Sequence, residues 1–292
     1  MKASPAESVF YGINYTFLIG VAAIMIFPFV HVIAISLSSS RAVLSQEVVI
    51  WPIEFSTRTY QNLIRDGSLF NALKNSVIVT VFGTILNMVA TIMVAYPMAR
   101  HNLRGRKTFL SLIIFTMLFN GGLIPTYVVV QQLGLLNTYW AIWLTGLVSI
   151  WNFFIMKTFF QSLPSSLIEA AAIDGANDLY SLIRIVLPLS MPVLATLTLF
   201  YAVNHWNSYF IVMLYITRTH LQTVMVRLMQ MIQSIDPQLM ELSGEADDLS
   251  RLITPEGVRA GAIVISTLPI MLVYPFLQKY FVKGVMIGSL KQ

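Results

Sequence analysis

Residues 76–99 read SVIVTVFGTILNMVATIMVAYPMA and contain no charged side chain. A helix needs about 20 predominantly apolar residues to cross the hydrocarbon core of a bilayer. This stretch therefore predicts a membrane-spanning helix by itself. Five other stretches meet the same criterion, and the predicted spans are residues 13–37, 76–99, 108–130, 139–156, 186–214 and 259–281.

The composition of the whole chain agrees with these spans. Of its 292 residues, 57% are hydrophobic and 11% are charged, whereas a soluble domain carries about 25% charged residues. So few charges cannot cover the surface of a soluble protein, and lipid must therefore cover part of it. We expect an all-α membrane protein with six transmembrane helices, in a single domain over residues 1–292.

The distribution of basic residues predicts on which side of the membrane the termini lie. With both termini in the cytoplasm, ten of the 18 Lys and Arg residues fall in the inner segments and eight in the outer segments, which are longer in total. The clearest contrast is between residues 100–107, with four bases, and residues 131–138, with none. Because positively charged loops stay inside, we expect a cytoplasmic N-terminus and C-terminus.

A cytoplasmic loop over residues 157–187 separates the fourth and fifth predicted spans. It contains the sequence SSLIEAAAIDGAND at residues 165–178. Ser166 and Glu169 have the spacing of a capping box, which predicts that a helix begins there.

The same loop also contains signals for a turn and a second helix. Gly175 can adopt the left-handed conformation that ends a helix. Asn177 or Asp178 can then cap a second short helix. The residues alone leave two interpretations open: a helix that docks on a partner protein, or a surface helix that only connects two spans.

The spacing within this loop resembles a known motif. Glu169-Ala170-Ala171, Gly175, Ile185 and Leu187-Pro188 match the EAA motif of permeases from binding-protein-dependent importers. In that family the loop forms a coupling helix, which docks into a cleft on an ATP-hydrolysing subunit. The resemblance implies a contact made by Glu169, Ala170, Ala171, Asp174 and Gly175. It also implies that the loop is held to the fifth span by Ile185, Leu187 and Pro188.

Other stretches resemble carbohydrate permeases related to the maltose importer. They include Trp51-Pro52, residues 95–100 (AYPMAR) and residues 279–284 (KYFVKG). Residues 119–127, FNGGLIPTY, resemble a subgroup that imports oligosaccharides of the uronate type, such as alginate. The resemblance implies the type I fold of ABC importer permeases. It also implies a chain that forms half of the translocation pathway of an ATP-driven sugar importer.

The resemblance further implies an assembly in the inner (cytoplasmic) membrane of a bacterium. Its expected members are a second, homologous permease subunit forming a heterodimer, two ATP-binding subunits and an extracytoplasmic sugar-binding protein. The sequence contains no glycine-rich phosphate loop and no cysteine. We therefore expect ATP and Mg²⁺ in the partner ATPase, and in this chain no cofactor, no metal site and no enzymatic activity.

Polar and aromatic residues within the predicted spans are candidates for contact with a sugar, because polar groups in lipid usually face a partner helix or a watery path. Tyr201, Asn204 and Ser208 recur at helical spacing and share one helix face. Two other interpretations stay open: Trp and Tyr as anchors at the membrane interface, and Asn as a tie between helices. The candidate path residues are Asn120, Tyr127, Trp151, Asn152, Tyr201, Asn204, Asn207 and Ser208.

The predicted outer loop, residues 215–258, begins with an amphipathic pattern in which apolar residues recur at helical spacing from Leu221 to Ile235. This helix either lies on the membrane interface or packs against the bundle. Residues 236–256 hold six acids and one base. This predicts a solvated segment, which is either a docking loop for the sugar-binding protein or a plain surface loop.

The sequence argues against three other classes of protein. The predicted spans contain no Asp or Glu, so an intramembrane aspartyl protease lacks its catalytic pair, and an ion-coupled secondary transporter lacks its usual coupling residues. The secondary transporter is the alternative function to be tested. The bases lie in short patches between apolar blocks, which argues against nucleic-acid binding.

Overall fold

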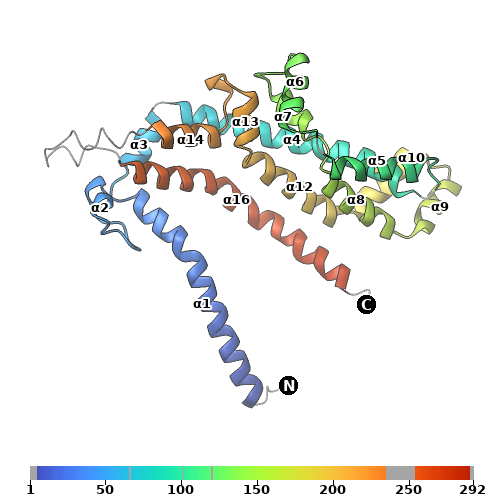
Figure 1. The fold of residues 1–292 in the computed structure, drawn as a ribbon. Coiled ribbons are helices and arrows are strands. Elements are labelled where there is room, and N and C mark those ends of the chain that lie inside the picture. The colour runs from blue at the N-terminus through green and yellow to red at the C-terminus, as the bar shows by residue number, and fades with distance from the viewer. Residues whose placement is uncertain (1–4, 66, 101, 120, 235–253, 290–292) are drawn as a thin grey trace. The chain divides into compact units, whose positions relative to one another are not determined.

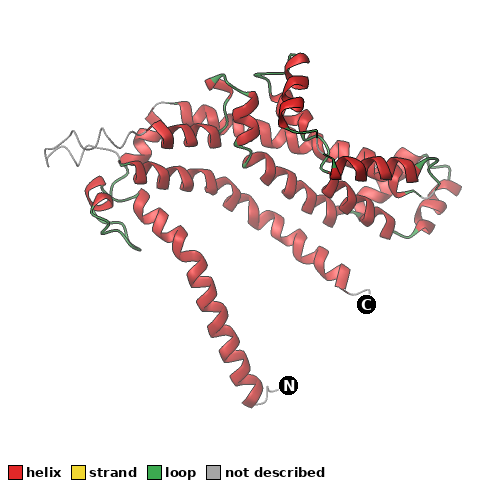
Figure 2. Cartoon of the chain, viewed as in Figure 1, coloured by secondary structure: helices red, strands yellow, loops and turns green. Residues whose placement is uncertain are grey.

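The structure, a computed structural model, describes residues 5–65, 67–100, 102–119, 121–234 and 254–289. Every regular element in these ranges is a helix, as Figure 2 shows, and no strand occurs among them. The expected all-α fold is therefore confirmed. The elements, labelled in Figure 1 where there is room, are α1 (Pro5–Ser36), α2 (Ser40–Leu44), α3 (Arg58–Arg65), α4 (Ser68–Ala99), α5 (Arg106–Leu118), α6 (Leu123–Gln132), α7 (Tyr139–Thr145), α8 (Ile150–Ser162), α9 (Ser165–Ile173), α10 (Asp178–Ser181), the π-helical turn η1 (Leu182–Val186), α11 (Leu187–Leu189), α12 (Met191–Trp206), α13 (Phe210–Tyr215), the 3-10 turn η2 (Thr219–Leu221), α14 (Val224–Ser234) and α16 (Pro255–Ser289).

Two of the described helices are long and apolar enough to cross a membrane alone: Phe10–Ser36 of α1, and α4. Three bent pairs meet the same criterion jointly, and each overlaps one predicted span. They are α5 with α6, bent by 111°; α7 with α8, bent by 54°; and Asp178–Leu189 with α12, bent by 84°. The remaining predicted span, residues 259–281, lies within α16.

Three predicted spans are therefore not single straight helices. Span 108–130 is interrupted before α6, where Gly122 has a φ of +86°, a conformation that glycine adopts without strain. Span 139–156 is interrupted by the four residues between α7 and α8. Span 186–214 becomes a straight helix only at Met191, and the chain turns again between α12 and α13.

The chain forms two compact units. The first comprises Met1–Leu69 with Leu228–Pro269, and the second comprises Phe70–Arg227 with Ile270–Gln292. The first unit holds α1 to α3, and the second holds the bent helix pairs.

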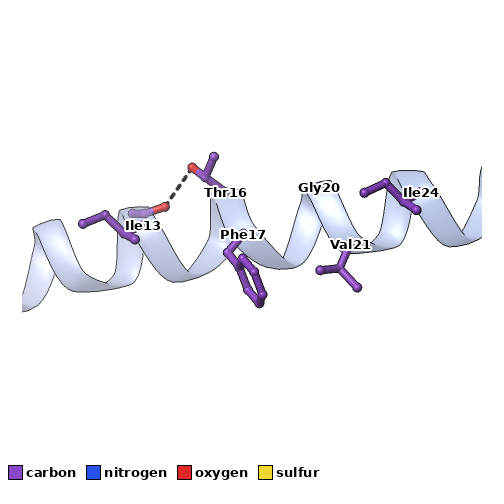
Figure 3. A pocket seen from close by; sticks show the side chains of 7 residues that line it. Ile13, Thr16, Phe17, Gly20, Val21 and Ile24 are labelled. Carbon is purple, nitrogen blue, oxygen red and sulfur yellow. Dashed lines mark hydrogen bonds between the residues drawn. The ribbon is translucent and has the colours of Figure 1, made fainter.

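In the first unit, α1 is exposed over most of its length. Figure 3 shows the part where Oγ1 of Thr16 donates to the carbonyl oxygen of Gly12 at 2.9 Å and the apolar side chains project outward. The hollow in this face is lined by residues of α1 alone, from Gly12 to Ile24. Its one polar side chain is already hydrogen-bonded, so this apolar face suits lipid and not a polar substrate.

The C-terminal end of α1 packs on the segments that follow it. Ala34 is buried in a cluster with apolar residues of α2 and the loop after it. Ser36 Oγ lies 2.8 Å from the hydroxyl of Tyr60 in α3. α3 also packs tightly on the start of α16, because a Cβ at Gly261 would lie 2.9 Å from Cγ2 of Thr59.

An ion pair holds the loop between α2 and α3. Arg41 and Ser39 both donate hydrogen bonds to the carboxylate of Glu54. The bond from Arg41, followed by the bond from Ser39, holds the pKa of Glu54 below its usual value, and the same pairing raises the pKa of Arg41. Because both side chains are exposed, the pair orders the loop locally and adds little to the stability of the fold.

The second unit is built around α4. Val79 of α4 belongs to a buried apolar cluster with α6, α7 and α13, and Tyr96 belongs to a second cluster with α8 and α12. Near the start of α4, Nδ2 of Asn75 donates to the carbonyl oxygens of His220 at 2.8 Å and Gln222 at 3.0 Å. A side chain of α4 thus satisfies loop carbonyls that have no helical partner.

α4 and α12 approach each other closely at Gly83. A Cβ at this position would lie 2.6 Å from Nε2 of His205 and 2.8 Å from its Cε1. A residue without a side chain therefore leaves room for the imidazole. The close approach brings buried polar residues of the two helices together.

We predict that Gly83→Ala lowers the stability of the protein. The new methyl group would push the His205 ring away from its hydrogen-bond partner. Overpacking of this kind costs about 1–3 kcal/mol, against a gain in helix propensity of about 1 kcal/mol. The melting temperature of the detergent-solubilised protein is the measurement.

Gly20→Ala is the matched control, because a Cβ at Gly20 meets nothing within 4 Å. Its melting temperature should stay the same or rise. Equal melting temperatures for the two variants would contradict the close approach at Gly83.

Candidate functional site

The break between α7 and α8 leaves the carbonyl groups of Gly146 and Leu147 and the N–H of Ser149 without helical partners. Nδ2 of Asn87 in α4 donates to the carbonyl oxygens of Gly146 at 2.6 Å and Leu147 at 2.8 Å. Its Oδ1 accepts a hydrogen bond from Nε2 of His205 at 2.6 Å. Because buried backbone groups need partners, the buried carboxamide of Asn87 is what allows the chain to break there.

Tyr201 of α12 closes the other side of the break. Its hydroxyl accepts from the N–H of Ser149 at 3.1 Å and lies 2.7 Å from Oγ1 of Thr91. Oγ of Ser149 in turn accepts from the backbone N–H of Asn152 and caps the start of α8. Two neighbouring helices, α4 and α12, therefore hold the start of α8 in place.

A cavity of about 660 Å³ lies beside these hydrogen bonds, a size typical of small-molecule sites. It is lined by α4, α7, α8, α12 and α13, and by the start of α6. Its polar lining consists of hydroxyl, carboxamide, imidazole and backbone groups. None of the described residues that line it is Asp, Glu, Lys or Arg.

Some of the predicted path residues lie at this cavity and others do not. Those that line it are Asn152, Tyr201, Asn204 and Ser208. Trp151 and Asn207 are exposed and are not among its lining residues. Tyr127 stacks on Tyr215, with ring centroids 6.1 Å apart. Asn120 lies outside the described residues.

Several polar residues of the cavity are not among those predicted from the sequence. An asparagine within an apolar span, as at position 87, is in principle a signal of a buried polar contact. Its partners could not be inferred, because Gly146 is 59 and His205 is 118 positions away along the chain. The missed lining residues include Asn87, Thr145, Ser149 and His205.

The loop before α12 contains the predicted short helix, α9. It ends as expected at Gly175, whose φ is +82°. The N–H of Ala176 donates to the carbonyl oxygen of Ala171 at 2.9 Å, the hydrogen bond of a Schellman motif. The side chain of Asn177 then caps α10 by accepting from the N–H of Tyr180 at 2.8 Å.

The start of α9 differs from the prediction. The helix begins at Ser165, Pro164 occupies the cap position, and no side chain caps the first turn. The expected capping box of Ser166 and Glu169 is therefore wrong. With proline in the cap position, the helix starts two residues earlier than a cap at Ser166 would allow.

α10 is fastened to the C-terminal end of α4. Nη2 of Arg100 donates to Oδ1 of Asp178 at 2.8 Å, and the hydroxyl of Tyr96 donates to the backbone carbonyl of Asp178 at 3.3 Å. Arg100 also donates to the hydroxyl of Tyr96. These three residues, the α4–α10 clasp, tie the loop to the helix that carries Asn87.

The predicted coupling residues differ in exposure. Ala171 is buried and Ile185 and Leu187 are half-buried, whereas the exposed ones are Glu169, Ala170, Asp174, Gly175 and Pro188. Large apolar side chains are exposed on the same segment, with Ile173 at 87%. Such a patch is typical of a protein interface. Its members are Leu167, Ile173, Leu179, Tyr180 and Ile183.

Residues 87–287 match the protein family described as "binding-protein-dependent transport system inner membrane component". The chain belongs to this family, and it is an inner-membrane transport component of a system that works with a binding protein. The match covers the cavity and the loop that contains α9 and α10.

The fold is that of an ABC importer permease. One chain in the crystal structure of a bacterial ABC transporter involved in the import of the acidic polysaccharide alginate matches it with a TM-score of 0.85 and 30% identity. That match covers 96% of this chain and 99% of the other chain. The expected importer permease fold is therefore confirmed.

Two relatives come from Bacillus subtilis (strain 168). The polygalacturonan/rhamnogalacturonan transport system permease protein YtcP is 42% identical over 95% of this chain and 96% of its own length. Protein LplC is 42% identical over 100% of this chain and 98% of its own length. The similarity therefore extends beyond the family match to the N-terminal helix.

We predict that Asp178→Ala loosens α10. The variant loses the ion pair with Arg100, and an exposed pair contributes up to about 1 kcal/mol, or roughly a fivefold change in an opening equilibrium. Amide hydrogen exchange of α10 should therefore become about fivefold faster.

The control is Asp174→Ala, which removes an exposed carboxylate that has no basic partner within 4 Å in the described part of the chain. Exchange in α10 should keep its original rate in this variant. Equal exchange rates in both variants would count against the clasp.

Proposed function

We propose that this chain is one of two permease subunits of an ATP-driven oligosaccharide importer. The observation that carries the proposal is the 42% identity with the polygalacturonan/rhamnogalacturonan permease over 95% of the chain. The 660 Å³ cavity lined by amides and hydroxyls supports it, because sugars are recognised by hydrogen-bonding groups. An ion-coupled secondary transporter has no support from the family match.

The substrate proposed is an oligosaccharide of an acidic polysaccharide. Polygalacturonan is named for one relative, and alginate for the transporter of similar structure. Both polysaccharides are built from uronic acids, so their oligosaccharides carry many hydroxyls together with carboxylates.

The proposed complex contains a second, homologous permease that makes a heterodimer, two ATP-binding subunits and an extracytoplasmic sugar-binding protein. ATP and Mg²⁺ bind in the ATPase subunits. This chain lies in the membrane with both termini in the cytoplasm, as the basic residues predict. Catalysis of ATP hydrolysis is assigned to the partners.

α9 is proposed as the coupling helix that docks on an ATPase subunit. Its exposed apolar side chains favour a protein contact. Nine residues make a helix that is marginal alone, and docking would stabilise it. The proposed contact residues are those of the motif: Glu169, Ala170, Ala171, Asp174 and Gly175.

The route from the coupling helix to the cavity is proposed to run through α4. Motion of α9 and α10 would pull on the α4–α10 clasp. The same helix holds the break between α7 and α8 through Asn87. Closure of the ATPase dimer would thereby move the helices that line the cavity and turn its opening from one side of the membrane to the other.

The purified assembly tests the proposal. We expect the chain to co-purify with an ATPase subunit, and the sugar-loaded binding protein to stimulate ATP turnover in proteoliposomes. Trigalacturonate is the first probe. Uptake that follows a proton or sodium gradient, with no ATPase subunit attached, would favour the secondary transporter.

We predict that Gly175→Pro uncouples ATP hydrolysis from uptake. Proline fixes φ near −65° and lacks an N–H, whereas Gly175 has a φ of +82° and donates to the carbonyl of Ala172. The end of α9 would be rebuilt, so sugar uptake should fall at least tenfold, which is an order-of-magnitude expectation from a lost docking geometry. ATP turnover should persist.

Gly175→Asn is the control, because asparagine tolerates the left-handed conformation. It should keep at least half of the wild-type uptake, roughly, since that strain is small for asparagine. Normal uptake by a well-expressed Gly175→Pro protein would overturn the role of α9.

A further inference from the structure

Two carboxamides at the cavity have no hydrogen-bond partner among the described residues. Asn152 of α8 and Asn204 of α12 both line the cavity. Asn152 is only 6% exposed, yet its hydrogen bond to Ser149 comes from the backbone N–H and leaves the side chain free. Buried polar side chains are usually paired, so the free carboxamide of Asn152 needs an explanation, whereas Asn204 is exposed.

Most of the other polar side chains of the cavity are already hydrogen-bonded within the chain. Asn87 uses both amide hydrogens and its oxygen within the chain. Tyr201 is bonded to Thr91 and Ser149. The hydroxyl hydrogens of Thr126, Thr145 and Ser208 are donated to backbone carbonyls. These groups shape the cavity, and the two free carboxamides are among the groups left to bind something in it.

The hydrogen bond between Ser149 and Tyr201 joins the two helices that carry the carboxamides. Asn152 follows Ser149 by three residues, and Asn204 follows Tyr201 by three. Residues three apart share a helix face, so Asn204 lies on the face of α12 that carries Tyr201, and both asparagines line the same cavity. Phe200, which is 42% exposed, lines the same cavity and adds an apolar surface.

We infer that Asn152, Asn204 and Phe200 form a subsite that recognises the hydroxyl groups of a bound sugar. A carboxamide has two donors and an acceptor, which suits the paired hydroxyls of a pyranose. The ring of Phe200 offers an apolar face to the C–H side of the sugar. The inference rests on the proposed function as a sugar importer.

This subsite is neutral. The described lining residues include no Asp, Glu, Lys or Arg, so nothing in it is paired to a carboxylate. It therefore binds an acidic sugar through its hydroxyls, and it does not distinguish a uronic acid ring from the corresponding neutral ring. The charge of an acidic substrate is met outside these residues.

The test uses the complete complex and a matched pair of probes. These are trigalacturonate and its carboxyl-reduced form, a trigalactoside, each radiolabelled and measured by equilibrium dialysis. Asn152→Ala and Asn204→Ala should each weaken the binding of both probes by about tenfold, the factor for one or two lost hydrogen bonds. The two probes should lose affinity by the same factor.

Asn207→Ala is the matched control, because Asn207 lies just after α12 but is not among the lining residues of the cavity. It should bind both probes as the wild type does. Unchanged binding in both Asn152→Ala and Asn204→Ala would overturn the subsite. A loss confined to trigalacturonate would also overturn it, since the site would then read charge.

Stability separates a binding role from a structural one. Asn152→Ala removes a carboxamide without an internal partner, so the melting temperature of the sugar-free complex should not fall. A lower melting temperature would mark Asn152 as a structural residue and contradict the inference.

If the wild-type complex shows sugar-stimulated ATP turnover but the two variants bind normally, the subsite alone fails. If the wild type shows no such turnover, the proposed function fails.

Discussion

The need to pair backbone groups where a membrane helix is broken governs the second unit. Lipid offers no hydrogen bonds, so non-helical backbone is tolerated there only where protein or a water-filled cavity satisfies it. Asn87 donates hydrogen bonds to the backbone carbonyls of Gly146 and Leu147, and the hydroxyl of Tyr201 accepts one from the N–H of Ser149. Because these side chains come from α4 and α12, the break ties three segments of the chain together.

The same bonds decide what the cavity can do. Most of its polar groups are consumed in holding the break, and an occupied donor cannot bind a ligand without leaving its partner unpaired, which is costly. The position of Gly83 belongs to this arrangement, because the imidazole of His205 fits against α4 only where there is no side chain. The break, the glycine and the free carboxamides therefore all belong to the region where α4, α8 and α12 pack around the cavity.

α4 also connects the cavity to loops at both ends of the helix. Tyr96 and Arg100 hold α10 there, and Asn75 holds the loop before α14. A single long helix with polar side chains at three levels can transmit displacement between distant loops. In the proposed importer, this makes α4 the element through which a small movement at α9 reaches the cavity.

Local sequence determined the helical class, the membrane environment and the end of α9, because each depends on neighbouring residues. Apolar runs of sufficient length predict helices in lipid, and Gly175 and Asn177 have conformational and capping preferences of their own. The EAA motif also pointed to the correct family. The interruptions at Gly122 and between α7 and α8 were hidden, because average apolarity does not change where a helix bends. Only the tertiary structure decided which asparagines are bonded internally and which are free. Asn87 and Asn152 both line the cavity, and they differ because the carboxamide of Asn87 is hydrogen-bonded to residues far along the chain, whereas that of Asn152 has no partner among the described residues.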